Sequence, residues 1–325
     1  MSTVSILDTH WVGRARSIAA ALLESNGHRA LVDPGPASTL PALRQGLAAR
    51  GLSVADLDAL LLTHIHLDHA GASGSLVREN PRLAVYVHQL GAPHMIDPTK
   101  LLASAARLWP QTLNQLFGDT QPVPAQNLRI LEGGEMLSVG ALKFQVLHTP
   151  GHASHHVSYF ADPDGLAFVG DTTGIRIENG PYILPATPPP DIDLEIWDRS
   201  LNSILARRPT RLFLTHFGYA DNPADHIAEF RERVHCWAEV AGNCLRAGVR
   251  ETDAGIPYAN KGSKDASGPG DDSAALACFV TKSLAEMEAH LGPVETEHHA
   301  FTAALDLSFR GLARYLRKRA TTTAA

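Results

Sequence analysis

The segment HIHLDH, from His64 to His69, places three histidines and one aspartate within six consecutive residues. It overlaps the end of the apolar run ALLLTHI (59–65), whose composition and length favour a buried strand. Residues two apart in an extended chain point to the same side, so His64 and His66 can face one metal ion. Asp68 and His69 follow in the next turn, close enough to bind a second ion. The motif therefore predicts a fold in which a strand ends at a metal-binding edge.

Three later strand-like runs also end in side chains that can bind metal. The stretch HTPGH offers His152, VGDTTG offers Asp171 and LTHFG offers His216. Imidazole nitrogen together with carboxylate oxygen suits Zn²⁺, and less exclusively iron, manganese or nickel. We therefore expect two divalent metal ions, with zinc as the first choice and iron or manganese as alternatives.

Short apolar runs alternate with helical patterns over residues 1–220, which is typical of a layered α/β fold. The predicted strands are 17–23, 29–35, 59–65, 82–88, 141–149, 155–160, 165–171 and 211–217. Helices are predicted over 39–50 and 191–208, where apolar residues recur at helical spacing. Residues 97–118 predict a helical insertion interrupted at Pro110, because proline ends or kinks a helix.

The pattern becomes helical after His216. Residues 226–246 place their apolar side chains on one face, and residues 258–272 form a linker rich in glycine, serine and aspartate. Two further amphipathic helices are predicted, with apolar stripes from Leu276 to Leu291 and from Phe301 to Leu316. We therefore expect an α/β domain over 1–222 and a helical C-terminal region over 223–325.

The charge of the chain excludes a general affinity for polyanions. The formal net charge is −6 at pH 7, so binding of nucleic acid would need a local basic patch. The basic stretch FRGLARYLRKRA (309–320) is the one candidate, and its spacing favours the exposed face of an amphipathic helix. A small-molecule substrate is therefore expected, with no nucleic-acid partner.

No apolar run approaches the roughly 18 to 20 residues of a membrane span, and the N-terminal sequence lacks a signal-peptide pattern. A cytoplasmic protein is expected. Its three cysteines, Cys236, Cys244 and Cys278, are interpreted as reduced thiols that act as small buried apolar residues. The exposed faces of the C-terminal helices are compatible with a homodimer.

The stretches THIHLDHAG, HTPGHASHH, VGDTT and LTHFG together resemble the metallo-β-lactamase superfamily, over roughly residues 17–220. The resemblance implies an αββα sandwich, two facing sheets with helices outside and a site along one edge. It assigns the first metal to His64, His66 and His152, the second to Asp68, His69 and His216, and a bridging position to Asp171. Asp33 matches an acidic position that supports the site from behind, whereas His148, His155 and His156 are left out of the ligand set.

The function implied by this resemblance is hydrolysis of a small ester, thioester or lactone by a hydroxide that bridges the two metals. Asp68 and Asp171 are the predicted catalytic carboxylates, since they would hold that hydroxide. Hydrolysis of a phosphodiester or phosphotriester is an alternative for the same site. A non-catalytic metal-binding sensor on the same fold is another.

This sequence differs from several known branches of the superfamily, and the differences reduce the number of candidate activities. The flavodiiron branch typically has glutamate where this chain has His66, and its flavin domain is missing here. Secreted β-lactamases need an export signal, and glyoxalase II-like enzymes carry a basic C-terminal glutathione-binding pattern that this sequence does not show. The tRNA-processing branch adds a flexible arm rich in glycine and basic residues, and no such insertion interrupts the α/β part. Lactonases and phosphotriesterase-like members need only the ligands and a pocket.

The segment 172–190 connects Asp171 to the next helix. Its triple proline, Pro188 to Pro190, favours a stiff extended conformation that forms one wall of the substrate groove. Arg176 and Tyr182 are the predicted substrate-binding residues, as oxyanion donors directed at the metals. The alternative is a plain connecting loop. Specificity is expected to reside here, in residues 97–118 and in the C-terminal region.

Overall fold

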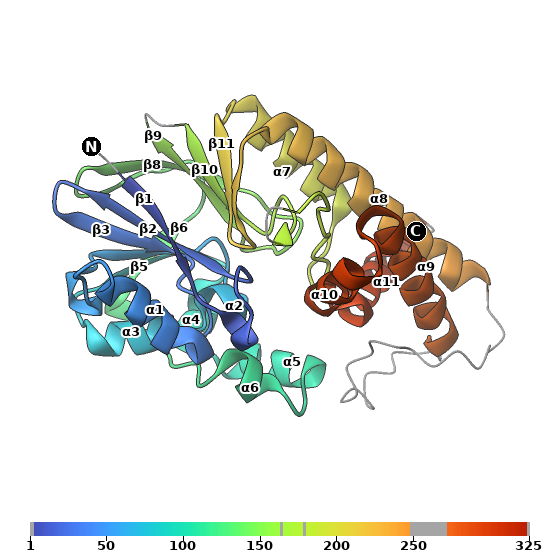
Figure 1. The fold of residues 1–325 in the computed structure, drawn as a ribbon, viewed down its shortest axis with the longest axis horizontal. Helices are drawn as coiled ribbons and strands as arrows, with labels where there is room; N and C mark the ends of the chain where they lie inside the picture. Colours follow the sequence, from blue (N-terminus) through green and yellow to red (C-terminus); the bar gives the residue numbers. More distant parts are fainter. Residues whose placement is uncertain (1–2, 163–164, 178–179, 248–271, 324–325) are drawn as a thin grey trace.

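Two six-stranded sheets form the centre of the fold (Figure 1). The computed structural model describes residues 3–162, 165–177, 180–247 and 272–323. The first sheet has the order β1-β2-β3-β4-β5-β6 and contains β1 (Thr3–Asp8), β2 (Ala19–Ser25), β3 (His28–Val32), β4 (Ala59–Leu61), β5 (Ala84–His88) and β6 (Leu128–Leu131). The second has the order β12-β11-β10-β9-β8-β7 and contains β7 (Met136–Val139), β8 (Leu142–His148), β9 (Val157–Asp162), β10 (Leu166–Gly170), β11 (Arg211–Leu214) and β12 (Gly218–Ala220).

Helices cover the outer face of each sheet. Those of the first half of the chain are α1 (Leu40–Ala48), α2 (Leu67–Ala70), α3 (Ser73–Glu79), α4 (Ala92–Ile96), α5 (Thr99–Leu108) and α6 (Leu113–Phe117). Those of the second half are α7 (Leu194–Ala206), α8 (Pro223–Ala247), α9 (Ser273–Leu291), α10 (Pro293–Ala303) and α11 (Leu305–Thr323). No helix among the described residues is long and apolar enough to cross a membrane.

Three apolar clusters give the order of the layers. Successive residues of β2 point to opposite faces, so Leu22 packs with α1 and α3 outside the sheet while Leu23 packs between the sheets. Phe144 of β8 and Phe168 of β10 meet Leu23 in that middle cluster. Trp197 of α7 belongs to the third cluster, on the outer face of the second sheet. The fold is therefore the αββα sandwich that the resemblance predicts.

Most predicted elements lie where the sequence places them. Each of the predicted strands overlaps an observed strand, and the insertion at 97–118 forms α5 and α6 on either side of Pro110. Four strands escaped prediction: β1, β6, β7 and β12. All four lie at the edges of the sheets or next to an edge strand, and each has six residues or fewer. Such strands are short and half exposed, so they carry little hydrophobic periodicity.

Residues 248–271 lie outside the described residues. After them the chain forms three helices, not the predicted two. Gly292, with φ of 76°, ends α9, and Pro293 begins α10 at a position where proline costs no hydrogen bond. The predicted linker 258–272 lies outside the described residues except for Asp272. Helices α9 and α11 pack on α8, and α10 packs on α9 and α11 (Figure 1).

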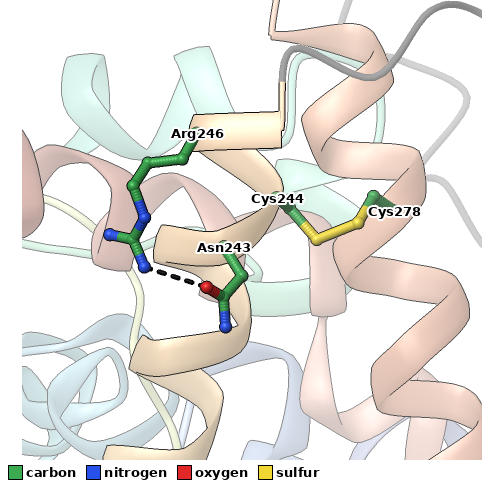
Figure 2. Close-up of a disulfide and its surroundings, with 4 residues drawn as sticks. All are labelled: Asn243, Cys244, Arg246 and Cys278. Atoms are coloured by element: carbon green, nitrogen blue, oxygen red, sulfur yellow. Dashed lines mark hydrogen bonds between the residues drawn. A yellow bond between two sulfur atoms is a disulfide. The ribbon is translucent and has the colours of Figure 1, made fainter.

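The prediction of a reduced thiol was wrong for Cys244 and Cys278, and the prediction of burial was wrong for Cys236. Cys244 of α8 and Cys278 of α9 form a disulfide, with Cα atoms 5.8 Å apart (Figure 2). Cys236 is a free thiol and is exposed rather than buried. An odd cysteine count does not reveal which pair meets, because the pairing depends on how α8 and α9 pack across the intervening segment.

Candidate metal centre

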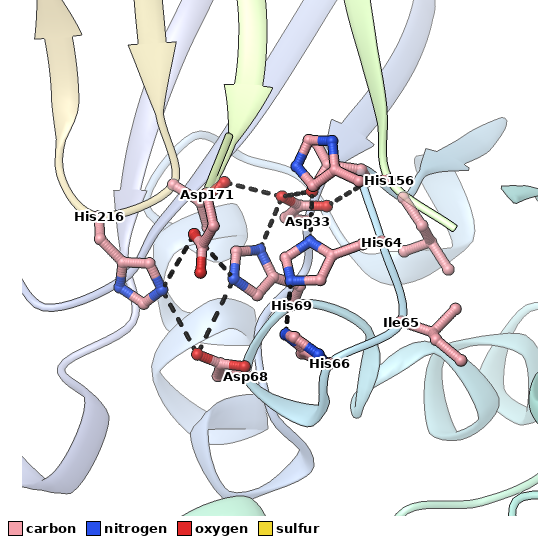
Figure 3. Close-up of polar contacts among 12 residues, drawn as sticks. Asp33, His64, Ile65, His66, Asp68, His69, His156, Asp171 and His216 are labelled. Carbon is pink, nitrogen blue, oxygen red and sulfur yellow. Dashed lines mark hydrogen bonds and ion pairs between the residues drawn. The ribbon is translucent and has the colours of Figure 1, made fainter. Parts of the chain in front are cut away.

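The seven predicted ligands converge at one edge of the sandwich, where strands of both sheets end, and Figure 3 labels all of them except His152. From the first sheet, His64 and His66 follow β4, and Asp68 and His69 lie in the short helix α2. From the second, His152 follows β8, Asp171 directly follows β10, and His216 follows β11. Residues up to 152 positions apart in the chain therefore share one site.

Three imidazoles form the first part of the centre. His66 Nδ1 lies 2.9 Å from His64 Nε2 and 3.0 Å from His152 Nε2. A neutral imidazole has one N–H donor and one acceptor, and an N–H can serve only one close acceptor well. Two ring nitrogens within about 3 Å of a third are better satisfied by a shared cation than by one another.

Two histidines and two carboxylates form the second part. His216 Nε2 lies 3.4 Å from Asp68 Oδ2, and His69 Nε2 lies 3.8 Å from the same oxygen. Asp171 stands between the two parts, with Oδ1 3.2 Å from His69 Nε2 and Oδ2 3.6 Å from His152 Nε2. Its two oxygens thus face different sets of donors, as a bridging carboxylate requires.

Hydrogen bonds at the opposite ring nitrogens fix the orientation of three histidines. The Nδ1 atoms of His152 and His216 lie 2.8 Å from the backbone carbonyl oxygens of Ala186 and Ser17. His64 Nδ1 lies 3.0 Å from Thr63 Oγ1. Such partners hold the ring and its tautomer so that Nε2 faces the centre, an arrangement typical of metal-binding histidines.

Asp33 lies behind the ligands and connects three strand ends. Its Oδ1 accepts a hydrogen bond from Thr63 N at 2.8 Å, while Oδ2 accepts from Thr63 Oγ1 and Thr215 Oγ1, both at 2.7 Å. The same oxygen lies 2.9 Å from His69 Nδ1. The carboxylate is fully buried, so these contacts replace its hydration. The position predicted to support the site from behind does so.

The surroundings of the centre shift the pKa values of its histidines and carboxyl groups. Burial lowers the pKa of His66 and of His152 to about 4, so both rings are neutral near pH 7. Burial also opposes ionisation of Asp68, but the nearby His69 and His216 outweigh it and hold the pKa of this carboxyl at about 2. Burial alone would lower the pKa of His69, whereas Asp171, Asp68 and Asp33 raise it. The carboxylates are therefore ionised and ready to bind a cation.

Unpaired buried atoms test whether a metal fits. Among the described residues, His69 Nε2, Asp171 Oδ1 and His216 Nε2 are buried and make no hydrogen bond. Buried polar atoms are seldom left in this state, and these three point at one another. Neutral imidazoles and ionised carboxylates are the donors that zinc, iron and manganese accept. The residues present fit divalent cations.

A cavity of about 1020 Å³ opens onto the centre. His66, Asp68, His152, Asp171 and His216 form part of its wall. The rest of the wall comes from the segment around Trp11, from α5 and α6, from residues 186–191 and from the α10–α11 junction. The prediction that Pro188 to Pro190 form a wall of the substrate groove is confirmed in position.

The two predicted substrate-binding residues do not line this cavity. The Tyr182 hydroxyl donates to Glu286 of α9, and the Arg233 guanidinium lies 3.9 Å from the centre of its ring. The Arg176 guanidinium donates to the Gly180 carbonyl. Their prediction rests on proximity to Asp171 in the sequence, whereas the loop directs Tyr182 into the C-terminal helices. We therefore withdraw both as substrate contacts.

The three histidines left out of the ligand set have other surroundings. His148 stacks on His88, with ring centroids 4.2 Å apart, and His156 contacts the hydroxyls of Thr149 and Thr172. His155 lines the cavity without joining the cluster. Sequence reasoning missed the carbonyls of Ser17 and Ala186, because any residue type supplies a carbonyl.

Comparison with known sequences gives one family and several relatives. The family described as the metallo-beta-lactamase superfamily matches residues 13–216. A metallo-beta-lactamase fold-containing protein, ST1585 of Sulfurisphaera tokodaii, is 30% identical over 215 residues, 63% of this chain and 80% of that protein. A hydroxyacylglutathione hydrolase of Aeromonas hydrophila is 30% identical over 151 residues, 46% of this chain and 44% of that enzyme. The chain thus matches less than half the length of this hydrolase.

Solved structures resemble the chain over nearly its whole length. The metallo-beta-lactamase family protein TTHA1429 of Thermus thermophilus has a TM-score of 0.63 and 20% identity, covering 98% of this chain and 94% of that one. The crystal structure of ST1585 has a TM-score of 0.60 and 19% identity, covering 95% and 98%. At this identity the likeness concerns the fold, including the helical C-terminal region.

Proposed function

Because the chain belongs to the metallo-beta-lactamase superfamily of metal-dependent hydrolases, we propose that its site hydrolyses a carboxylic ester, thioester or lactone. The observation that carries this proposal is the convergence of seven buried or half-buried donor side chains beside a large cavity. We assign His64, His66 and His152 to one divalent cation, Asp68, His69 and His216 to another, and Asp171 to both.

The roles of the residues follow from their surroundings. Bound divalent cations lower the pKa of a shared water and polarise the carbonyl of the substrate. Asp68 is ionised and half-buried at the cavity wall, so it can accept the proton of the attacking water and return it to the leaving group. Asp171 orients the same water between the two sets of donors. Water adds to the carbonyl carbon, the bond to oxygen or sulfur breaks, and a carboxylate and an alcohol or thiol leave.

A thioester is the first substrate class to test within this proposal. One relative is named a hydroxyacylglutathione hydrolase, whose substrate is a thioester by its name, and it is 30% identical to this chain over 151 residues. Phosphodiesters and phosphotriesters are the second class, since the same donors suit a phosphoryl centre. A sensor without catalysis is the remaining alternative.

Metal stoichiometry and turnover test the assignment together. We expect His152→Ala and His216→Ala each to lower bound metal and to reduce kcat/KM by at least about 100-fold, as loss of a ligand does. Elemental analysis and turnover of a panel of thioesters, lactones and phosphoesters provide the two readouts. His235→Ala, an exposed histidine of α8, is the matched control. Two tightly bound ions in both ligand variants would contradict the assignment, and no turnover of any substrate by metal-loaded protein would favour the sensor.

Three finer points belong to the same proposal. We propose zinc as the native metal, with iron or manganese as alternatives, because nitrogen and oxygen donors accept all three. A cytoplasmic location and a homodimer remain predictions. The Cys244–Cys278 disulfide is typical of oxidising compartments, so thiol labelling of the protein in cells tests the location directly. Sedimentation of the purified chain tests the dimer.

A further inference from the structure

The cavity is larger than a small ester or lactone needs. Its volume of about 1020 Å³ lies at the upper end of the 300 to 1,000 Å³ that is usual for small-molecule pockets. The metal-binding residues occupy only one part of its wall. The remaining wall therefore has the space and the position to bind a second part of the substrate.

Helix α5 turns its apolar face toward this cavity. Leu101, Ala105 and Leu108 recur at helical spacing and line it, whereas Ala103 and Arg107 are exposed on the other side of the helix. An amphipathic helix normally covers its apolar stripe with protein core. Here Leu101 and Leu108 are only half-buried, so the stripe borders open space.

Aromatic rings extend this surface beyond α5. Trp11 and Trp109 line the cavity and pack on Phe117, with ring centroids 5.9 Å and 5.0 Å from it. The Trp11 indole N–H donates to the Leu116 carbonyl at 2.6 Å. Because that polar group is already satisfied, the ring offers apolar surface to a ligand.

Apolar side chains also line the cavity between α5 and the metal centre. Leu67 belongs to the same apolar cluster as Ala105 and Phe117, and it lies between the ligands His66 and Asp68 in the chain. Ile65 and Leu67 also line the cavity beside those ligands. A chain that starts at the metal centre can therefore lie along α5 in contact with carbon atoms.

We propose that this acyl wall, formed by Trp11, Leu67, Leu101, Ala105, Leu108 and Trp109, binds a long aliphatic acyl chain of the substrate. The carbonyl of that acyl group lies at the metal-binding residues. The proposal rests on the proposed ester or thioester hydrolysis and names its substrate class: medium- to long-chain acyl esters or thioesters. A substrate with a short acyl group leaves the wall unused.

Chain-length dependence tests the acyl wall. The substrates are butanoyl, octanoyl and dodecanoyl thioesters of N-acetylcysteamine, hydrolysed by the metal-loaded full chain, with the released thiol measured. Each buried methylene raises kcat/KM by about two- to fourfold, so octanoyl should exceed butanoyl by at least about tenfold. Leu108→Glu places a charge on the wall and should reduce the octanoyl-to-butanoyl ratio of kcat/KM by about tenfold. Ala103→Glu, on the exposed side of α5, should leave the ratio unchanged.

Two further measurements keep the outcomes distinct. Leu108→Ala, which shortens the side chain without adding charge, should lower the ratio in the same direction even if Leu108→Glu fails to fold. Calorimetric titration with 1-decanol, which has no scissile bond, should show binding that Leu108→Glu weakens at least about fivefold. Equal kcat/KM for all three thioesters overturns the acyl wall and leaves the hydrolase standing. Decanol binding without turnover of any ester or thioester overturns the hydrolase and supports the wall, and absent decanol binding overturns the wall.

Discussion

The carboxylate of Asp33 joins residues of both sheets although it holds no metal in our assignment. It accepts hydrogen bonds from Thr63 in the first sheet and from Thr215 in the second, and it holds the ring of His69. Its φ of 48° lies in the left-handed region, which aspartate and asparagine tolerate better than most residues. The backbone there is therefore compatible with an amide substitution.

Asp33→Asn should lower the free energy of unfolding by about 2 to 4 kcal/mol, because an amide nitrogen replaces an oxygen that faces buried donors. Urea unfolding measures the change. Asp58→Asn is the control, since its carboxylate also accepts a backbone hydrogen bond but is half exposed, and it should cost less than about 1 kcal/mol. Equal losses for the two variants would contradict a special role of Asp33.

His226 of α8 connects the C-terminal region to the loop that follows Asp171. Its Nε2 lies 2.9 Å from the Thr173 carbonyl, and burial lowers its pKa to about 4. The unfolded chain, in which histidine titrates near 6.5, therefore takes up this proton first, and the folded state loses stability as the pH falls from about 6.5 toward 4.

We expect the titration of His226 to lower the free energy of unfolding of the wild type by about 2 kcal/mol between pH 7.5 and pH 5. His226→Gln retains an N–H donor but no titrating group, so the free-energy difference between variant and wild type should move in favour of the variant by that amount. Urea unfolding at both pH values gives the result. A difference that does not change with pH would show that His226 is not buried as a neutral ring.

The metal-binding residues could be predicted because each lies in a short motif at a strand end. His64, His66, Asp68 and His69 need only one turn of chain to converge. Tyr182 could not be placed in this way, since its partner Glu286 lies 104 residues away, in helix α9. Local spacing carries no information about such a contact.

At the scale of elements, α11 packs directly on the loop that orients one ligand. A Cβ atom on Gly311 would lie 2.0 Å from the Thr187 carbonyl oxygen, so α11 approaches this loop as closely as glycine permits. Thr187 Oγ1 also donates to the Ser308 carbonyl at 3.2 Å. The neighbouring Ala186 supplies the carbonyl that holds His152. The C-terminal helix therefore supports the metal centre through one loop.

Gly311→Ala should lower stability by about 1 to 3 kcal/mol and reduce bound metal, because the clash moves residues 186–188. Thermal unfolding and metal analysis measure both effects. Gly242→Ala in α8 is the control, because its Cβ would meet the flexible Arg246 side chain at 3.3 Å and Leu316 Cδ1 at an ordinary contact distance of 3.6 Å, and alanine favours the helix. If Gly311→Ala kept its full metal content, α11 would not be needed to support the metal centre.

The predicted helices and central strands were confirmed because their apolar residues repeat at a regular period. The edge strands β7 and β12 were not predicted, since runs of three or four residues are too short to show such a repeat. The number of C-terminal helices was wrong because the predicted apolar stripe from Phe301 to Leu316 runs across Ala304, where α10 ends and α11 begins. Ala304 has a φ of 41°, and an alanine gives no sequence signal of such a break, unlike glycine or proline.

At the scale of the whole molecule, the helical region shares its core with the second sheet. Phe230 of α8, Phe279 of α9 and Phe309 of α11 belong to the same apolar cluster as Leu212 of β11. Helix α8 begins at Pro223, next to the predicted division at residue 222, and the division into two parts stays a prediction. The disulfide between α8 and α9 adds a covalent link within this region.

Replacing both Cys244 and Cys278 with serine should lower the free energy of unfolding by about 3 to 4 kcal/mol, given the 34-residue separation of the bridged cysteines. Chemical reductant should give the wild type the same loss. Cys236→Ser, at the exposed thiol, should change stability by less than about 0.5 kcal/mol. A wild type that reductant does not affect would show that the bridge is absent in solution.

Each sheet is built from one continuous segment of the chain, with β1 to β6 between Thr3 and Leu131 and β7 to β12 between Met136 and Ala220. The first segment provides His64, His66, Asp68 and His69, and the second provides His152, Asp171 and His216. Cations bound by ligands from both segments would connect the two sheets. Removing them with a chelator would then weaken that connection, and the cooperativity of unfolding, as well as its midpoint, would report whether the cations are bound.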